Sequence, residues 1–200
     1  MRSLVEAARD PAYPAEIALV LSNIATAAGL DYARAQGIAT TALDHKLFRD
    51  REGFERAMQE TLLGHQIDLV CLAGFMRLLT PWFVEQWRDR MLNIHPALLP
   101  SYRGLHTHER ALADGVKIHG ATVHFVAPEM DAGPIVVQAA VPVLQDDTPD
   151  ALAARVLAQE HRIYPLALKL VAGGATRVEG ARVLTKSAAP PPEPLLWPAG

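Results

Sequence analysis

Short apolar runs alternate with amphipathic segments through the first half of the chain. Strand-like runs occupy residues 17–22, 39–43 and 68–73, and the last is the clearest because its apolar residues are continuous. Residues 26–36 and 51–63 between them have the spacing of apolar positions that predicts helices. Strands that alternate with helices of about ten to fifteen residues favour βαβ units and a parallel sheet.

The pattern changes after residue 93. A proline-punctuated stretch leads into segments that alternate in polarity, which is typical of antiparallel strands added to a parallel sheet. A helix-like segment also opens the chain, before the first strand. The further predicted elements are helices at 4–9, 107–114 and 149–172, strands at 121–126 and 134–143, and a hairpin at 177–184.

Composition narrows the class of protein. The 200 residues are 50% hydrophobic and 20% charged, which is typical of one globular domain, and the net charge of -3 gives no basic field for nucleic acid or acidic lipid. We assign residues 1–186 to this domain and predict a disordered, proline-rich tail at 187–200. We see no membrane span and no signal peptide, and the single Cys71 excludes a cysteine cluster. We therefore expect a cytoplasmic enzyme or small-molecule binder.

Three polar residues are candidates for catalysis. Asn93 and His95 follow a strand-like approach and are two residues apart, so their side chains can face one ligand from the same side. An amide donor beside an imidazole can stabilise a developing oxyanion while protons move. Asp131 lies in a turn before a strand, and near His95 it would stabilise the imidazolium. Taken alone, both patterns also fit ordinary loop residues.

Two other features have more than one interpretation. Four histidines lie within a short segment, but their spacing does not put three ligands on one face, so polar groups lining a cleft are favoured over a metal site. The segment 74–79 follows the clearest strand, where open α/β sheets bind ligands, and its apolar side chains fit either a ligand wall or a core. The histidines are His106, His108, His119 and His124.

Taken together, the motifs over residues 1 to about 185 closely resemble the phosphoribosylglycinamide formyltransferase family of folate-dependent enzymes. The order of the motifs carries the resemblance, and the run from Gly104 to His108 resembles this family more than related formyl-transferring or formyl-hydrolysing enzymes. The matching pieces are Ser22-Asn23, Leu72-Ala-Gly-Phe-Met-Arg77, Leu92-Asn-Ile-His-Pro96, Leu98-Leu-Pro-Ser-Tyr-Arg-Gly-Leu-His-Thr-His108, His119-Gly-Ala-Thr-Val-His-Phe-Val126, Asp131-Ala-Gly-Pro134, Gln138-Ala-Ala-Val-Pro142 and Gln159-Glu-His-Arg-Ile-Tyr-Pro165.

The resemblance implies a fold and a reaction. The fold is α/β and Rossmann-like, with a mixed, mostly parallel sheet and helices on both faces, and the bond between Leu99 and Pro100 is cis. In the reaction, the amine of 5'-phosphoribosylglycinamide attacks the formyl group of 10-formyltetrahydrofolate, with no metal and no covalent enzyme intermediate. Asn93, His95 and Asp131 would be catalytic, and the side chains of His95 and Asp131 should meet at the strand ends.

The resemblance also implies binding residues and partners. Both substrates are small molecules, and we expect no nucleic-acid or membrane partner and a monomer or weak homodimer. The implied nucleotide-binding residues are Arg51 and Glu160. The implied folate-binding residues are Phe75, Met76, Arg77, Leu79, Val126 and Met130.

The amino terminus departs from the family pattern. The family begins with an apolar strand and a Gly-x-Gly-Ser-Asn turn that binds the substrate phosphate, whereas residues 1–6 match the segment directly after that turn. We therefore expect that the first strand and the phosphate loop are missing, that Met1 is an internal methionine, and that the strands beginning at Ile17 and Asp68 are open edges. Two alternatives remain: a formyltetrahydrofolate hydrolase, and a non-catalytic folate-binding remnant.

Overall fold

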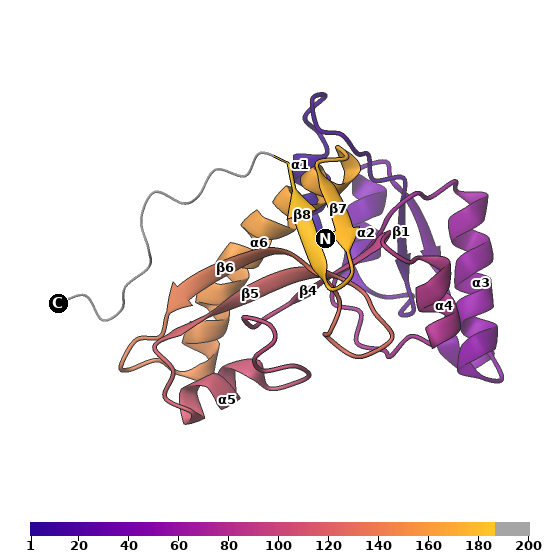
Figure 1. Cartoon of the computed structure of the whole chain (residues 1–200). Coiled ribbons are helices and arrows are strands. Elements are labelled where there is room, and N and C mark those ends of the chain that lie inside the picture. Colours follow the sequence, from indigo (N-terminus) through magenta and orange to yellow (C-terminus); the bar gives the residue numbers. More distant parts are fainter. Residues whose placement is uncertain (187–200) are drawn as a thin grey trace.

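A six-stranded mixed sheet runs through the middle of the molecule (Figure 1). The computed structural model describes residues 1–186, so the predicted tail at 187–200 lies outside the described residues. The order β3-β4-β5-β6-β8-β7 combines parallel pairs, β3–β4 and β6–β8, with antiparallel pairs, β4–β5, β5–β6 and β7–β8. The mixed α/β sheet expected from the resemblance is thus confirmed. Its strands are β3 (Val70–Leu72), β4 (Met91–His95), β5 (Ile118–Phe125), β6 (Ile135–Pro142), β7 (Thr176–Glu179) and β8 (Arg182–Thr185).

Six helices accompany the strands of the described chain, and three of them, α3, α4 and α6, start at a residue whose side chain caps the helix. Thr148 accepts a hydrogen bond from Ala151 N at the start of α6, and Asp50 accepts one from Gly53 N at the start of α3. The sequence pattern did not predict α4, although Thr80 caps it and a proline occupies its first turn. The helices are α1 (Arg2–Ala7), α2 (Ala28–Ala35), α3 (Arg51–Gly64), α4 (Pro81–Gln86), α5 (Thr107–Ala113) and α6 (Pro149–Ala172), and a 3₁₀ turn η1 covers His45–Leu47.

Helices pack on both faces of the sheet, as expected, and two neighbouring residues of β4 mark the two cores. Met91 belongs to the cluster formed with α3 and α4, whereas Leu92 belongs to the cluster formed with α6. Successive side chains of a strand point to opposite faces, and both residues are fully buried, so each fills a different core. By the same alternation, the side chains of Asn93 and His95 project from the same face of β4 as Met91.

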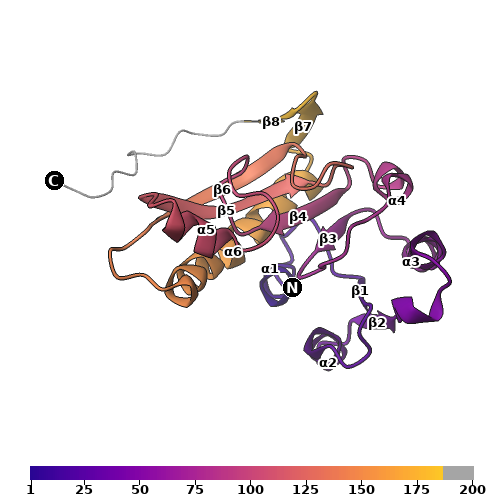
Figure 2. The ribbon, with the colours of Figure 1, turned by 90° about the horizontal axis from the view of Figure 1, so that it is seen from below.

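A second, two-stranded parallel sheet consists of β1 (Leu19–Ser22) and β2 (Ala39–Ala42). Within the described residues, no strand pairs with β1 or β3 on the sides opposite β2 and β4. Figure 2 shows β1 beside β3. A cavity of about 530 Å³ is lined by residues of both strands. The open edges expected at these two strands are confirmed.

Two further findings concern the backbone and the helices. The peptide bond between Leu99 and Pro100 is cis, which confirms the expectation from the resemblance. Among residues 1–186, no helix combines the length and the apolar composition that crossing a membrane requires.

Candidate active site

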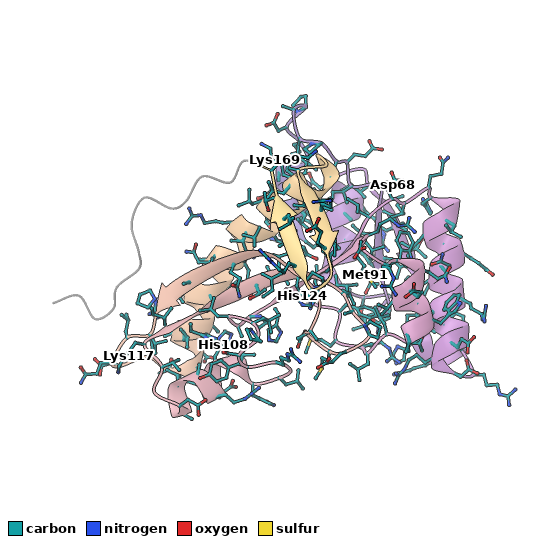
Figure 3. All side chains as sticks on the ribbon, viewed as in Figure 1. Asp68, Met91, His108, Lys117, His124 and Lys169 are labelled. Atoms are coloured by element: carbon teal, nitrogen blue, oxygen red, sulfur yellow. The ribbon has the colours of Figure 1, made fainter. Side chains whose placement is uncertain are left out.

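Two adjacent antiparallel strands bring together the polar side chains of the candidate site. Asn93 and His95 lie two residues apart on β4, and the register pairs Asn93 with His124 and His95 with Thr122 on β5. Figure 3 labels His124 on this strand. The side chains of His95 and His124 are almost completely buried. The sheet backbone therefore fixes the relative positions of Asn93, His95 and His124.

His124 has both ring nitrogens engaged. Its Nδ1 lies 2.8 Å from the carbonyl oxygen of Phe125, which can only accept, so Nδ1 carries the proton. Its Nε2 lies 3.3 Å from Asn93 Nδ2 and accepts from that amide. Burial lowers the pKa of His124, which keeps the ring in this neutral form despite the nearby carboxylate of Asp131.

A tight turn after β5 presents Asp131. The backbone of Asp131 is left-handed, with φ of 52°. Gly133 follows it, and a Cβ at Gly133 would lie 1.8 Å from the carbonyl oxygen of Phe125, so a larger residue would push the turn away from β5. The turn thus depends on a glycine for its close approach to the sheet.

Asp131 faces His95 across the site. Its Oδ2 lies 3.4 Å from His95 Nδ1 and accepts a hydrogen bond of 2.9 Å from the backbone N–H of Gly104, while its Oδ1 lies 3.7 Å from His124 Nε2. On the other side of the imidazole, His95 Nε2 donates to the carbonyl of Tyr102 at 2.9 Å. The expected meeting of His95 and Asp131 is confirmed, and the Nδ1 side of His95 is the side that faces the carboxylate.

The four histidines singled out in the sequence do not converge. His106 is exposed at the start of α5, whereas His108 and His119 stack edge to face with ring centroids 5.3 Å apart. Burial, and next the neighbouring His108, lower the pKa of His119 to about 4. In residues 1–186, no group of three or more histidine, cysteine, aspartate or glutamate side chains is arranged to hold a metal ion.

The residues expected to bind folate lie on two segments, 75–79 and 126–130, beside the cluster of Asn93, His95 and Asp131. Phe75, Leu79 and Val126 are half-buried and pack against the core of α3 and α4. Met76 is 78% exposed and Met130 is 50% exposed. The guanidinium of Arg77, the remaining residue of this group, lies 5.8 Å from the ring centroid of Phe54. Phe75 and Leu79 also line the cavity between β1 and β3.

The two residues expected to bind the nucleotide lie on different helices. Arg51 is exposed at the first position of α3. Glu160 is half-buried on α6, where burial raises its pKa and the amino group of Met1 partly offsets this rise. No contact within the described chain joins Arg51 to Glu160.

Backbone groups contribute to the site in a way that the sequence did not predict. Tyr102 and Gly104 contact His95 and Asp131 through a main-chain carbonyl and a main-chain N–H. Side-chain chemistry gives no signal for such groups. The one signal in the sequence is the glycine itself, because glycine readily adopts a left-handed backbone such as the φ of 80° at Gly104.

Comparison with known proteins supports one family. The model of the formyl transferase family matches residues 1–168. The chain is 43% identical over 192 residues to phosphoribosylglycinamide formyltransferase of Escherichia coli, a match that covers 96% of this chain and 91% of that protein. It is 48% identical over 184 residues to the trifunctional purine biosynthetic protein adenosine-3 of Bos taurus, covering 92% of this chain but only 18% of that protein.

A solved structure agrees with the sequence comparisons. The crystal structure of glycinamide ribonucleotide transformylase 1 from Symbiobacterium toebii superimposes with a TM-score of 0.90 at 44% sequence identity. The match covers 93% of this chain and 88% of that one. The similarity therefore extends over the site as well as over the sheet that carries it.

Proposed function

The chain belongs to the formyl transferase family, and from this we propose that it transfers a formyl group from 10-formyltetrahydrofolate to the amine of 5'-phosphoribosylglycinamide in purine biosynthesis. The observation that carries the proposal is the cluster of Asn93, His95 and Asp131, with His95 Nδ1 3.4 Å from Asp131 Oδ2. The match to a relative of this activity along 91% of its length supports the same reaction.

The reaction needs stabilisation of negative charge on one oxygen. As the amine nitrogen bonds to the formyl carbon, the formyl oxygen takes up negative charge. Asn93 donates one N–H of its amide to His124, which leaves the second N–H to donate to that oxygen. In the same site, a protonated His95 adds a positive charge on its Nδ1 side.

The reaction also needs a proton to move from the attacking amine to the departing nitrogen. The bond from the formyl carbon to the folate nitrogen breaks as that nitrogen takes the proton, so no net proton leaves the site. Asp131 is the candidate acceptor and donor, because the Gly104 N–H holds its carboxylate beside His95. No covalent bond to the enzyme is required at any step.

The surroundings of the cluster fit the two substrates. Met76 and Met130 are exposed apolar side chains beside the half-buried Phe75, Leu79 and Val126, which together suit an apolar, aromatic ring system. In the proposal these residues and Arg77 hold the folate, which supplies the formyl group. Arg51 and Glu160 are the proposed partners of the nucleotide's phosphate and ribose. We further propose a cytoplasmic monomer or weak homodimer with no metal, nucleic-acid or membrane partner.

The alternatives differ from this proposal in the reaction. A formyltetrahydrofolate hydrolase would use water as the acceptor, and a folate-binding remnant would have no reaction. The names of the relatives in Escherichia coli and Symbiobacterium toebii favour the transferase. Loss of 10-formyltetrahydrofolate that depends on added 5'-phosphoribosylglycinamide distinguishes the transferase from both alternatives.

Two substitutions test the site itself. His95→Ala and Asp131→Asn should each lower kcat by about 10² to 10⁴, because each removes a group from the proposed proton and charge arrangement. Asp150→Asn, in the exposed first turn of α6, is the matched control and should leave kcat unchanged. Wild-type turnover in either site variant, or breakdown of the folate without the amine substrate, would contradict the proposal.

A further inference from the structure

The segment from Tyr102 to Leu105 contacts both members of the proposed proton-transfer pair. The carbonyl of Tyr102 accepts from His95 Nε2, and the N–H of Gly104 donates to Asp131 Oδ2, each at 2.9 Å. Tyr102 has a left-handed backbone with φ of 56°, which residues with a side chain rarely adopt. This segment therefore needs support from its surroundings to keep both contacts.

Arg110 on α5 provides that support from one side chain. Its Nη1 donates to the carbonyl of Arg103 at 2.7 Å and reaches the carbonyl of Leu105 at 3.4 Å, so it bridges the residues on either side of Gly104. Its Cζ lies 5.4 Å from the centroid of the Tyr102 ring. One planar guanidinium thus contacts the segment at three places, which an ammonium group is poorly shaped to do.

The helix that carries Arg110 is itself anchored to the site. The side chain of Thr107 donates to the carbonyl of Pro96 at 2.7 Å, and Pro96 directly follows His95. Ala111 is fully buried in the core formed with α6. The start of α5 therefore has a fixed position relative to His95. Arg110, on the same helix, connects residues 102–105 to this fixed position.

We infer that Arg110 is a positioning residue for the formyl transfer, an inference that rests on the proposed function. Through the carbonyls of Arg103 and Leu105, it holds the Gly104 N–H on Asp131 and the Tyr102 carbonyl on His95. Without it, the segment loses these three contacts, and the bonds from Gly104 to Asp131 and from His95 to Tyr102 lengthen together. Arg110 itself touches no reacting atom.

The test replaces Arg110 in the full chain and measures both catalysis and the Gly104 amide. Arg110→Ala should lower kcat about 10-fold, because small displacements of catalytic groups reduce the rate strongly, while KM for 5'-phosphoribosylglycinamide changes less. Hydrogen exchange at the Gly104 amide, followed by NMR, should become at least several-fold faster. Arg110→Lys should give an intermediate value of kcat.

The matched control is Arg162→Ala on α6, whose side chain reaches Gln159 of the same helix. It should change neither kcat nor exchange at Gly104. Unchanged kcat and unchanged Gly104 exchange in Arg110→Ala would overturn the inference, as would an equal rise in exchange across the whole sheet, which indicates general loss of stability. If the wild-type chain transfers no formyl group, the proposed function fails, and the exchange measurement still decides whether Arg110 holds this segment.

Discussion

Asn93 and His124 lie directly opposite each other on β4 and β5, and Asn93 Nδ2 is 3.3 Å from His124 Nε2. The Nδ1–H of His124 is committed to the carbonyl of Phe125, so its Nε2 is an acceptor. The pairing therefore fixes which way the Asn93 amide faces. An amide rotated by 180° would place its oxygen against the lone pair of His124, which is repulsive.

Replacing His124 should therefore reduce catalysis through Asn93. His124→Phe keeps an aromatic ring in the buried position but removes the acceptor, and we expect kcat to fall by about 10- to 100-fold, because a small displacement of a catalytic group lowers the rate by up to about 10²-fold. Steady-state kinetics with a thermal unfolding curve checks this. His65→Phe, at an exposed position, is the control. A folded His124→Phe variant with wild-type kcat would show that Asn93 needs no such partner.

The period of a strand made part of this site predictable. Asn93 and His95 are two residues apart in a strand-like run, and that spacing alone places both side chains on one face. The position of Asp131 beside them came only from the resemblance, because a turn 36 residues after His95 in the sequence has no fixed position in a local pattern. Contacts between distant segments depend on the whole sheet order.

Backbone groups and buried charges could not be predicted from the sequence. The Gly104 N–H that holds Asp131 belongs to every residue type except proline, so no pattern of residues reveals it. Glu55 is only 1% exposed although it lies on a helix with several charged residues. Its burial results from the packing of α4 against α3, and α4 itself was not predicted.

Glu55 yields a prediction about stability. Its Oε1 accepts from the Thr80 backbone N–H at 2.8 Å, and its Oε2 pairs with the Thr80 hydroxyl, which joins α3 to the start of α4. Glu55→Ala removes the acceptor of both the N–H and the O–H of the half-buried Thr80 and should lower the unfolding free energy by about 2 to 3 kcal/mol. Urea denaturation measures this change.

The neighbouring residue Glu52 provides the control for Glu55. It lies in the first turn of α3 and forms an exposed pair with Arg56. Glu52→Ala should change the unfolding free energy by only about 0 to 1 kcal/mol. Equal losses in the two variants would show that the burial of Glu55 and its bonds to Thr80 do not contribute specifically.

His119 predicts a pH dependence of stability. Burial and the neighbouring His108 lower its pKa to about 4 in the folded chain, against an ordinary value of 6.5. Between these two values the unfolded chain binds the proton more strongly, so the unfolding free energy falls as the pH drops from about 6.5 to about 4. The lowered pKa values of His108 and His124 act in the same direction.

Denaturation curves at several pH values test this dependence. In His119→Leu the unfolding free energy should change less steeply between pH 6.5 and 4, with a smaller slope left by His108 and His124. His65→Gln, an exposed histidine, should keep the wild-type slope. If His119→Leu also keeps the wild-type slope, protonation of His119 is not coupled to unfolding, which contradicts the prediction.

The open edges of β1 and β3 expose particular backbone groups. Val70 N donates to the Arg90 carbonyl next to β4, and the Ser22 carbonyl accepts from Leu43 N next to β2, each at 2.9 Å. Successive residues of a strand direct their N–H and C=O groups to opposite sides. The groups of Cys71 and Leu21 therefore face the cavity between the two strands, which both residues line.

We predict that the amides of Cys71 and Leu21 exchange with solvent faster than those of Leu72 and Val20, whose groups face the paired side. Because unpaired strand edges also template pairing between chains, the protein should associate as its concentration rises, which light scattering detects.

An extended peptide of valine and isoleucine with lysine ends should slow exchange at the amides of Cys71 and Leu21, since the cavity has apolar walls on both faces. The same peptide with N-methylated backbone groups should have no effect, because the methyl groups replace the N–H donors of the ladder and sterically prevent close approach to the strand edge. Slow exchange at Cys71 and Leu21 without any peptide would contradict the prediction and show that these edges are already paired.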